Sequence, residues 1–118
     1  MDRDGVITLC TDLPEAVEDY PFGDDVAVFK ICGKVFALIL LSGEPGSVNL
    51  KCDPVWALEL RAQHRAVRPG YHANKRHWNT VDLDDTIPDD DVHDMVIHSY
   101  EMVIKGLPRD DRRRLLGQ

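Results

Sequence analysis

Residues 26–41, VAVFKICGKVFALILL, are the stretch of sequence that decides the fold. The first six of these side chains fall alternately on two faces, which predicts a β-strand. Cys32-Gly33 then predicts a tight turn into KVFALILL, the most apolar part of the chain. That part is far shorter than the ~20 apolar residues of a membrane-spanning helix, and its large side chains suit a central strand. The stretch therefore predicts a β-hairpin in the middle of a sheet.

A third strand is predicted directly after a loop at residues 42–46. In SVNLKC, residues 47–52, apolar and polar side chains alternate, so one face of this strand belongs to the core. The other face carries Ser47, Asn49 and Lys51 and is available to solvent. Because the turns between these first three strands are short, we expect them to pair in antiparallel fashion.

Three helices are predicted by apolar spacing and by capping residues. Residues 6–13 place apolar side chains at i, i+3, i+4 and i+7. Asp53-Pro54 is a strong helix start, because aspartate caps free amides and proline loses nothing at the first position. Pro88 and the three aspartates after it open a last helix with an apolar stripe up to residue 107. Between these two helices, HWNTVDL at residues 77–83 alternates and predicts a further strand.

These elements predict one two-layer α/β sandwich, in which the helices cover one face of the sheet and the other face stays partly open. The expected order is α-β-β-β-α-β-(β)-α, which amounts to an α+β fold of about five strands and three helices. A chain of 118 residues suffices for one hydrophobic core.

Charge is segregated along the chain, although the net charge is −7. Residues 1–25 sum to −7 and residues 81–101 to −8, whereas residues 56–80 sum to +4 and residues 102–118 to +3. Salt screens each local field within about 10 Å, so a basic surface on an acidic protein can still attract phosphate. The alternative is that acidic helix starts and basic helix ends merely satisfy helix dipoles and solubility.

The cysteines and the N-terminus suggest a cytoplasmic protein. Cys10, Cys32 and Cys52 are odd in number and include no CxxC pair, so we interpret them as reduced and mostly buried. The N-terminal residues show no secretory signal, and no apolar run is long enough for a membrane helix.

Residues 67–83, VRPGYHANKRHWNTVDL, gather basic, amide and aromatic side chains near turn residues, which folding alone does not explain. Taken with YPFG at residues 20–23, VAVFKICGKVFAL at 26–38, NLKCDP at 49–54 and GLP at 106–108, this run resembles the MmcQ/YjbR family. The resemblance covers residues 4–108. We therefore predict a single MmcQ/YjbR-like domain over residues 1–108 and a basic C-terminal tail over residues 109–118.

The resemblance implies a curved antiparallel sheet with helices packed on it, similar to double-wing DNA-binding domains and to small frataxin-like (CyaY-like) and secretion-chaperone-like sheets. Members of the family are commonly labelled DNA-binding, a label that rests on fold analogy. This chain departs from the family pattern at Ala73, where a larger apolar residue is usual, and at Trp56, where polar residues are usual.

A nucleic-acid site is predicted in the 68–78 segment and at Lys51, where cations contact phosphates and aromatic side chains stack or enter a groove. Asn49, on the same strand as Lys51, and Asn74 are the candidates for contacts to base edges. The alternative is that Tyr71 and Trp78 anchor the core while the charges decorate a sheet face. The predicted site residues are Lys51, Arg68, Tyr71, His72, Asn74, Lys75, Arg76, His77 and Trp78.

Other functions have weaker support in the sequence. Asp94, His98 and Glu101 share one helix face, but helix-surface ion pairing explains them better than a metal site. No spacing among His72, His77, Cys52 and Asp82 selects a catalytic mechanism. We therefore expect a non-enzymatic protein with no cofactor or metal. The main alternative to DNA binding is a protein-interaction or chaperone-like module, including a homodimer, for which an exposed Trp56 is a candidate contact.

Overall fold

The central hairpin forms as the alternation predicts. The computed structural model describes residues 1–117, and in it β2 (Val26–Ile31) and β3 (Lys34–Leu40) pair in antiparallel register. Cys32 and Gly33 join them, and both have positive φ, 49° and 77°. Two consecutive residues with positive φ make the hairpin turn whose twist matches that of the flanking strands.

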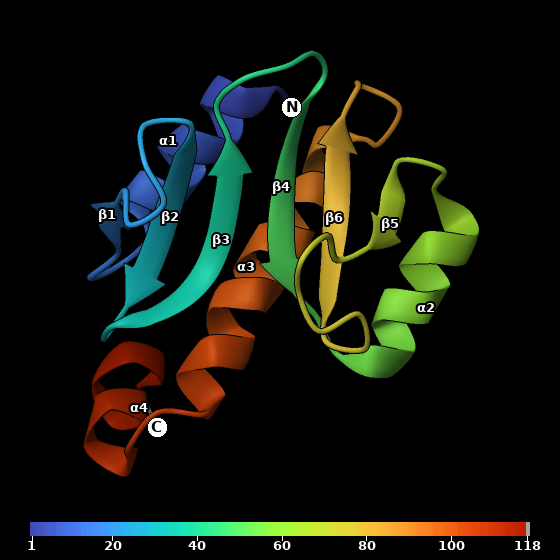
Figure 1. The fold of residues 1–118 in the computed structure, drawn as a ribbon. Helices are drawn as coiled ribbons and strands as arrows, with labels where there is room; N and C mark the ends of the chain where they lie inside the picture. Colours follow the sequence, from blue (N-terminus) through green and yellow to red (C-terminus); the bar gives the residue numbers. More distant parts are fainter. Residues whose placement is uncertain (118) are drawn as a thin grey trace.

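The hairpin lies within a six-stranded sheet of order β1-β2-β3-β4-β6-β5, in which every neighbouring pair is antiparallel (Figure 1). One edge strand, β1, lies in the acidic connector for which the sequence predicts no strand. Its three side chains are all exposed, so it has no apolar alternation to reveal it. The other strands are β4 (Gly46–Lys51), β5 (Val67–Pro69) and β6 (Trp78–Leu83), and β1 spans Val17–Asp19.

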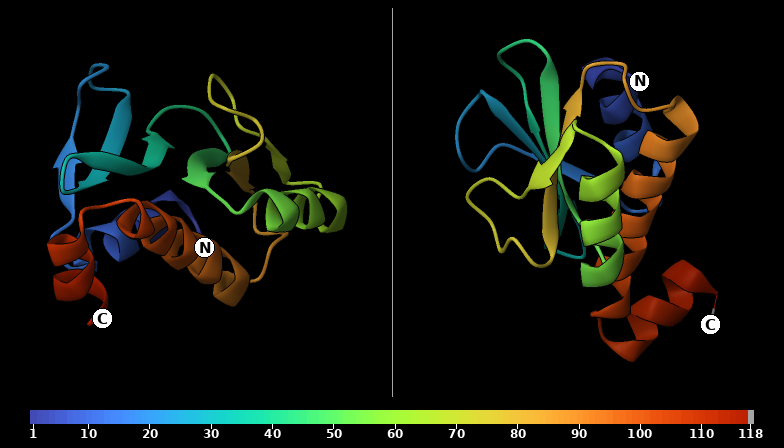
Figure 2. Two further views of the ribbon diagram at one scale, coloured as in Figure 1. Left: turned by 90° about the horizontal axis from the view of Figure 1, so that it is seen from below. Right: turned by 90° about the vertical axis from the view of Figure 1, so that its right-hand side faces the viewer.

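All the helices lie on the same side of the sheet, so the other face is open (Figure 2). The predicted α+β two-layer fold is therefore confirmed, and residues 1–117 form six strands and four helices in place of about five and three. Asp53 caps α2 by accepting hydrogen bonds from two backbone amides at 3.1 Å, as expected of the Asp-Pro start. The helices are α1 (Arg3–Asp12), α2 (Pro54–Gln63), α3 (Asp89–Lys105) and α4 (Arg109–Leu116).

A buried hydroxyl fixes α3 beneath the central strands. Phe36 has no partner in β2, because Phe29 pairs with Ala37 and Lys30 with Val35, so β3 carries a β-bulge there. Ser99 of α3 donates to the carbonyl oxygen of Phe36 at 2.6 Å and accepts from the backbone amide of Lys51 at 2.8 Å. Ser99 is fully buried. One side chain thus ties α3 to β3 and β4 at the end of the sheet where Lys51 lies.

The C-terminal segment differs from the prediction of a basic tail. Residues Arg109–Leu116 form α4, and Gly117 ends the helix in the left-handed conformation with φ 70°. Leu115 and Leu116 pack partly buried against the core. Arg114 donates to both carboxylate oxygens of Glu15, at 2.8 and 3.0 Å. The short apolar pair and a contact between distant residues explain why periodicity did not reveal this helix; residue 118 lies outside the described residues.

Candidate nucleic-acid interface

Unpaired cations gather at one end of the molecule. At this end β3 begins, β4 ends, β6 begins and α3 ends (Figure 1). Within residues 1–117 none of these cations forms an ion pair. The opposite end carries the aspartates of the loop after β6 and of the first turn of α3. We call the first surface the basic end, and it comprises Lys34, Lys51, Lys75, Arg76, Lys105, Arg109, Arg112 and Arg113.

Lys51 and Trp78 lie side by side at this end, because they are register partners in β4 and β6. Both side chains are half-buried. They line a hollow of about 370 Å³ together with Lys34 and Val35 of β3 and the C-terminal part of α3. Lys51 and Trp78 both belong to the site predicted from the sequence. They are 27 residues apart in the sequence, and the pairing of β4 with β6 brings them together.

The loop from Gly70 to His77 is held over the open face by its backbone. The amide of Tyr71 donates to Oγ1 of Thr80 at 2.9 Å, and its carbonyl accepts from Nδ2 of Asn49 at 3.1 Å. Thr80 in turn donates to Oδ1 of Asn49 at 2.5 Å. The Tyr71 side chain stays 60% exposed and packs against His72, with ring centroids 4.0 Å apart. A fixed backbone therefore presents an exposed aromatic pair.

Arg61 fixes the second half of this loop against α2, and sequence reasoning missed it. Its guanidinium donates to Oδ1 of Asn79 at 2.7 Å and to the backbone carbonyls of Lys75 and Trp78. Oδ1 of Asn74 accepts from the amide of Arg76 at 3.0 Å, which closes a local turn. No periodicity in the sequence marks Arg61, because its acceptors come from other elements.

Lys75 and Arg76 consequently lie beside α2. With Arg61 they line a hollow of about 470 Å³, whose remaining wall consists of Pro54, Val55 and Leu58. The side chains of Lys75 and Arg76 are exposed. The structure therefore gives two neighbouring basic surfaces, one next to Lys51 and one next to α2.

Arg68 is set apart from the other predicted cations. It pairs with Asp82 through two hydrogen bonds of 3.1 and 2.8 Å on the open face, and this carboxylate raises the pKa of Arg68. Its charge is thereby compensated within the chain. The amides proposed for base contacts are also engaged, because Asn49 and Asn74 both hold the loop.

The remaining predicted residues have structural contacts of their own. The carbonyl oxygen of His77 accepts from the amide of Cys52 at 2.7 Å, which joins the loop to the β4–α2 connection. His72 is exposed and has a positive φ of 53°. The imidazole of His77 is half-buried.

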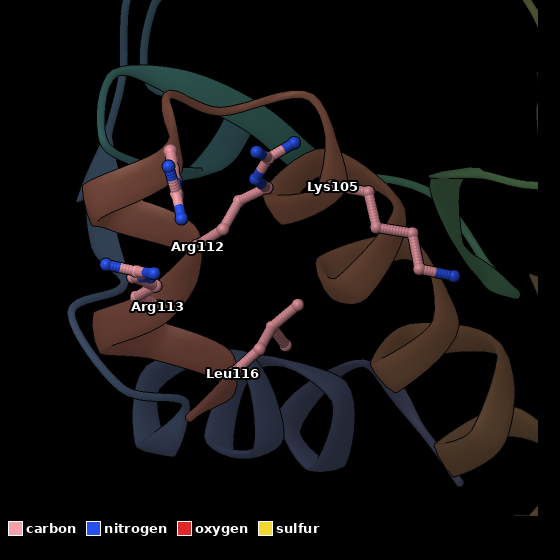
Figure 3. Close-up of a pocket in the computed structure, with 5 residues that line it drawn as sticks. Lys105, Arg112, Arg113 and Leu116 are labelled. Atoms are coloured by element: carbon pink, nitrogen blue, oxygen red, sulfur yellow. The ribbon is translucent and has the colours of Figure 1, made fainter. Parts of the chain in front are cut away.

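A third hollow, of about 490 Å³, lies between the end of α3 and α4 (Figure 3). In Figure 3, Arg112 extends from α4 toward the end of α3, Lys105 extends away from α4, and Leu116 lies below them. The remaining lining residues are Arg109 and Arg113.

Neither a metal site nor a site for thiol chemistry is assembled in the described part of the chain. No group of three or more His, Cys, Asp or Glu side chains within residues 1–117 is placed to hold a metal ion. His98 instead accepts from the amide of Asp53 at 3.0 Å and meets the Trp56 ring edge-on, and burial lowers its pKa. Burial raises the pKa of Cys10 to about 12 and of Cys52 to about 11.

The four helices offer no candidate for crossing a membrane. None of the helices within residues 1–117 has the length and apolar character that a crossing requires. The cytoplasmic location stays a prediction.

The fold and the site define a small α+β protein with one open sheet face and a basic end. Residues 11–102 match the family model described as YjbR. The chain belongs to the YjbR family, which confirms the resemblance.

Relatives and solved structures agree with this assignment. The chain is 37% identical to YbdF of Escherichia coli O157:H7 over 108 residues, 91% of this chain and 88% of that protein. It is 39% identical to YjbR of Escherichia coli K12 over 89 residues, 75% of each chain. The crystal structure of Deinococcus radiodurans protein DR2400, with its DUF419 domain, superposes with a TM-score of 0.89 at 37% identity, covering 97% of this chain and 87% of that one. A crystal structure from Pseudomonas syringae gives a TM-score of 0.75 at 26% identity, covering 86% and 98%.

Proposed function

We propose that this YjbR-family protein binds DNA without catalysing a reaction, and that the basic end makes the contact. One observation carries the proposal: unpaired cations from the start of β3, the end of β4, the Gly70–His77 loop and the α3–α4 region line hollows at one end of the molecule. Lysine and arginine side chains that contact phosphates release condensed counterions, which supplies most of the affinity of sequence-independent binding.

The distribution of acidic side chains supports an oriented complex. Aspartates after β6 and at the start of α3 lie at the end opposite the basic end. DNA repels that end and attracts the other, so the charge asymmetry orients the approach. Because salt screens each field within about 8 to 10 Å, the net charge of −7 does not prevent contact at the basic end.

The aromatic and amide side chains favour nucleic-acid binding that depends little on the base sequence. Tyr71 is exposed on a fixed backbone, and an unpaired base that stacks on such a ring contributes about 1–3 kcal/mol. Asn49 holds the loop through both Nδ2 and Oδ1, and Oδ1 of Asn74 accepts from the Arg76 amide, so few side-chain amide groups remain to read base edges. We therefore expect phosphate and stacking contacts with little direct base readout.

Fluorescence anisotropy of labelled duplexes and single strands tests the proposal, with titrations at about 50 and about 200 mM salt. We expect affinity that falls steeply with salt and changes little with sequence. The double variant Lys75→Ala/Arg76→Ala should weaken binding on every sequence. It should also reduce the salt slope by about 1 for each phosphate that the variant no longer neutralises.

Arg65→Ala is the matched control, because Arg65 is exposed near the other end of α2, outside the basic end. This control should leave both the affinity and the salt slope unchanged. Absence of binding at the lower salt concentration, or binding without a salt slope, would contradict the proposal.

A protein-interaction role is the second candidate, and one observation favours it. Val55 and Leu58 of α2 are 67% and 63% exposed beside Lys75 and Arg76. This surface suits a partner segment that combines apolar side chains with carboxylates. The exposed contact that the sequence suggested, Trp56, is half-buried against His98, so Val55 and Leu58 take its place.

Light scattering over a concentration series tests whether a second copy is that partner. A dimer that Leu58→Asp dissociates would support the interaction role. A monomer at every concentration, with no change on Leu58→Asp, would exclude the homodimer.

A further inference from the structure

The hollow between α3 and α4 is lined by positively charged side chains that form no ion pair within residues 1–117. Its wall consists of Lys105, Arg109, Arg112, Arg113 and Leu116. Within residues 1–117 none of these four cations has a carboxylate partner. The neighbouring Arg114, by contrast, pairs with both Glu15 and Asp111. Glu15 and Asp111 thus pair with Arg114 and not with the cations that line the hollow.

The spacing on α4 turns these cations to one side. Positions 109, 112, 113 and 116 are separated by three and four residues, so they share one helix face. Together with Lys105 at the end of α3 these residues line the hollow, and Figure 3 shows Arg112 extending from α4 toward α3. Arg109 is also the first residue of α4, where the helix dipole disfavours a positive charge. This arrangement is unfavourable for the free protein and becomes favourable when an anion enters the hollow.

The size and lining of the hollow indicate the class of anion. A volume of about 490 Å³ exceeds what one inorganic ion needs and falls in the range of small-ligand sites. Four of the five lining residues are cationic and only Leu116 is apolar, so the ligand needs several negative charges and little apolar surface. Arginine forks match phosphate oxygens in pairs. About one helical turn separates Arg109 from Arg112 and Arg113, by about 4.5 and about 6 Å along the axis, a spacing suited to neighbouring phosphates.

We propose that the α3–α4 hollow binds two or more adjacent phosphate groups, supplied either by a free oligophosphate or by consecutive phosphates of a nucleic-acid strand. In the second case the inference rests on the proposed function, because the hollow then holds part of the DNA. In the first case it is independent of DNA. The two sources present the same chemistry to the arginines and are distinguished by experiment.

Isothermal titration calorimetry with inorganic tripolyphosphate, beside anisotropy with DNA, tests this site on the full chain. Arg112→Gln removes one lining cation, and Lys105→Gln/Arg112→Gln removes one from each helix. We expect Arg112→Gln to weaken tripolyphosphate binding about tenfold, the effect of losing a charged hydrogen bond. Arg65→Gln, with the same loss of charge outside the hollow, should change the affinity less than about twofold. Thermal unfolding of each variant checks that α4 stays folded.

The outcomes separate this inference from the DNA proposal. Weaker tripolyphosphate binding in the hollow variants alone supports the site with a free oligophosphate as ligand, even if DNA does not bind. If the hollow variants bind DNA more weakly and tripolyphosphate does not bind, the result supports the phosphate site with a nucleic-acid strand as its ligand. If neither affinity responds to the hollow variants, or if Arg65→Gln has an equal effect, the hollow is not a phosphate site.

Discussion

Nε of Arg61 donates to Oδ1 of Asn79 over 2.7 Å, and this contact joins α2 to β6. Asn79 is 2% exposed, and its Nδ2 is buried without a partner within residues 1–117. Arg61 therefore supplies the only hydrogen bond that the Asn79 side chain makes in the described part of the chain. The same guanidinium reaches the carbonyls of Lys75 and Trp78, so one side chain supports both the sheet and the loop of the candidate site.

Arg61→Ala should destabilise the protein by about 1–3 kcal/mol, because it leaves a buried amide oxygen without a donor. The variant should also weaken DNA binding, since the Lys75–Arg76 turn loses its anchor. Urea denaturation measures the first effect and anisotropy the second. Arg65→Ala, a solvent-exposed arginine just beyond α2, should stay within about 0.5 kcal/mol of the parent protein. Equal stability of the two variants would contradict this role of Arg61.

Gly70→Ala should destabilise the loop, because a Cβ atom at this position would lie 2.8 Å from Cβ of Trp78 and 2.9 Å from its carbonyl oxygen. The Gly70 amide also donates to that oxygen at 2.9 Å, so the backbone is unable to retreat without losing a hydrogen bond. We expect a loss of about 1–3 kcal/mol in denaturation experiments. Gly106→Ala is the control: its new Cβ would lie 3.5 Å from the carbonyl oxygen of Val103, an ordinary contact, and its φ is negative. A control as unstable as Gly70→Ala would refute the steric explanation.

The docking of α4 should depend on pH through Glu15. Its hydrogen bond to Arg114 lowers the pKa of the Glu15 carboxyl. A lowered pKa in the folded state means that the stabilisation is complete above the ordinary pKa of glutamate and is lost as the pH falls through the lowered value. The protection factors of the Arg109–Leu116 amides, in which exchange rates are corrected for the intrinsic rate at each pH, should therefore fall at acidic pH. Glu15→Gln should show low protection factors already at neutral pH and little further change on acidification. Unchanged protection in this variant would show that Leu115 and Leu116 hold α4 without the ion pair.

The three cysteines should differ in reactivity towards a thiol reagent. Cys32 is exposed in the hairpin turn, whereas Cys10 and Cys52 are buried, with pKa values raised to about 12 and about 11. Because the thiolate is the reactive form, only Cys32 should react in the folded protein. Cys32→Ser should abolish this fast reaction, and unfolding in urea should expose the other two thiols. Fast labelling that persists in Cys32→Ser would indicate local opening around Cys10 or Cys52.

Local signals accounted for four strands of the sheet and for the first three helices. Alternation predicted β2, β4 and β6, the apolar run predicted β3, and Asp53-Pro54 predicted the start of α2. The sequence did not predict the three-residue strands β1 and β5, because their side chains are mostly exposed and backbone pairing defines them. The helix α4 escaped because Leu115, Leu116 and the Arg114–Glu15 pair stabilise it from outside its own sequence.

The candidate site could be predicted only in part. The sequence drew attention to Lys51, Lys75, Arg76 and Trp78, and β4–β6 pairing places two of these side by side. It gave equal weight to Arg68, whose charge Asp82 compensates, and it overlooked Arg61. When two residues that are distant in the sequence form an ion pair, the residues next to each of them in the sequence do not reveal it. A local sequence pattern therefore does not distinguish an unpaired cation from one whose charge a carboxylate compensates.

The sequence by itself determined the class of fold and the total charge of each segment, because side-chain alternation, helix caps and residue charges are local properties. Only the tertiary structure decided which cations remain unpaired, which loop Arg61 supports, and that the α3–α4 hollow exists. The reason is that ion pairs and hollows form between elements far apart in the chain, such as Glu15 and Arg114, and their positions follow from packing the whole sheet against its helices.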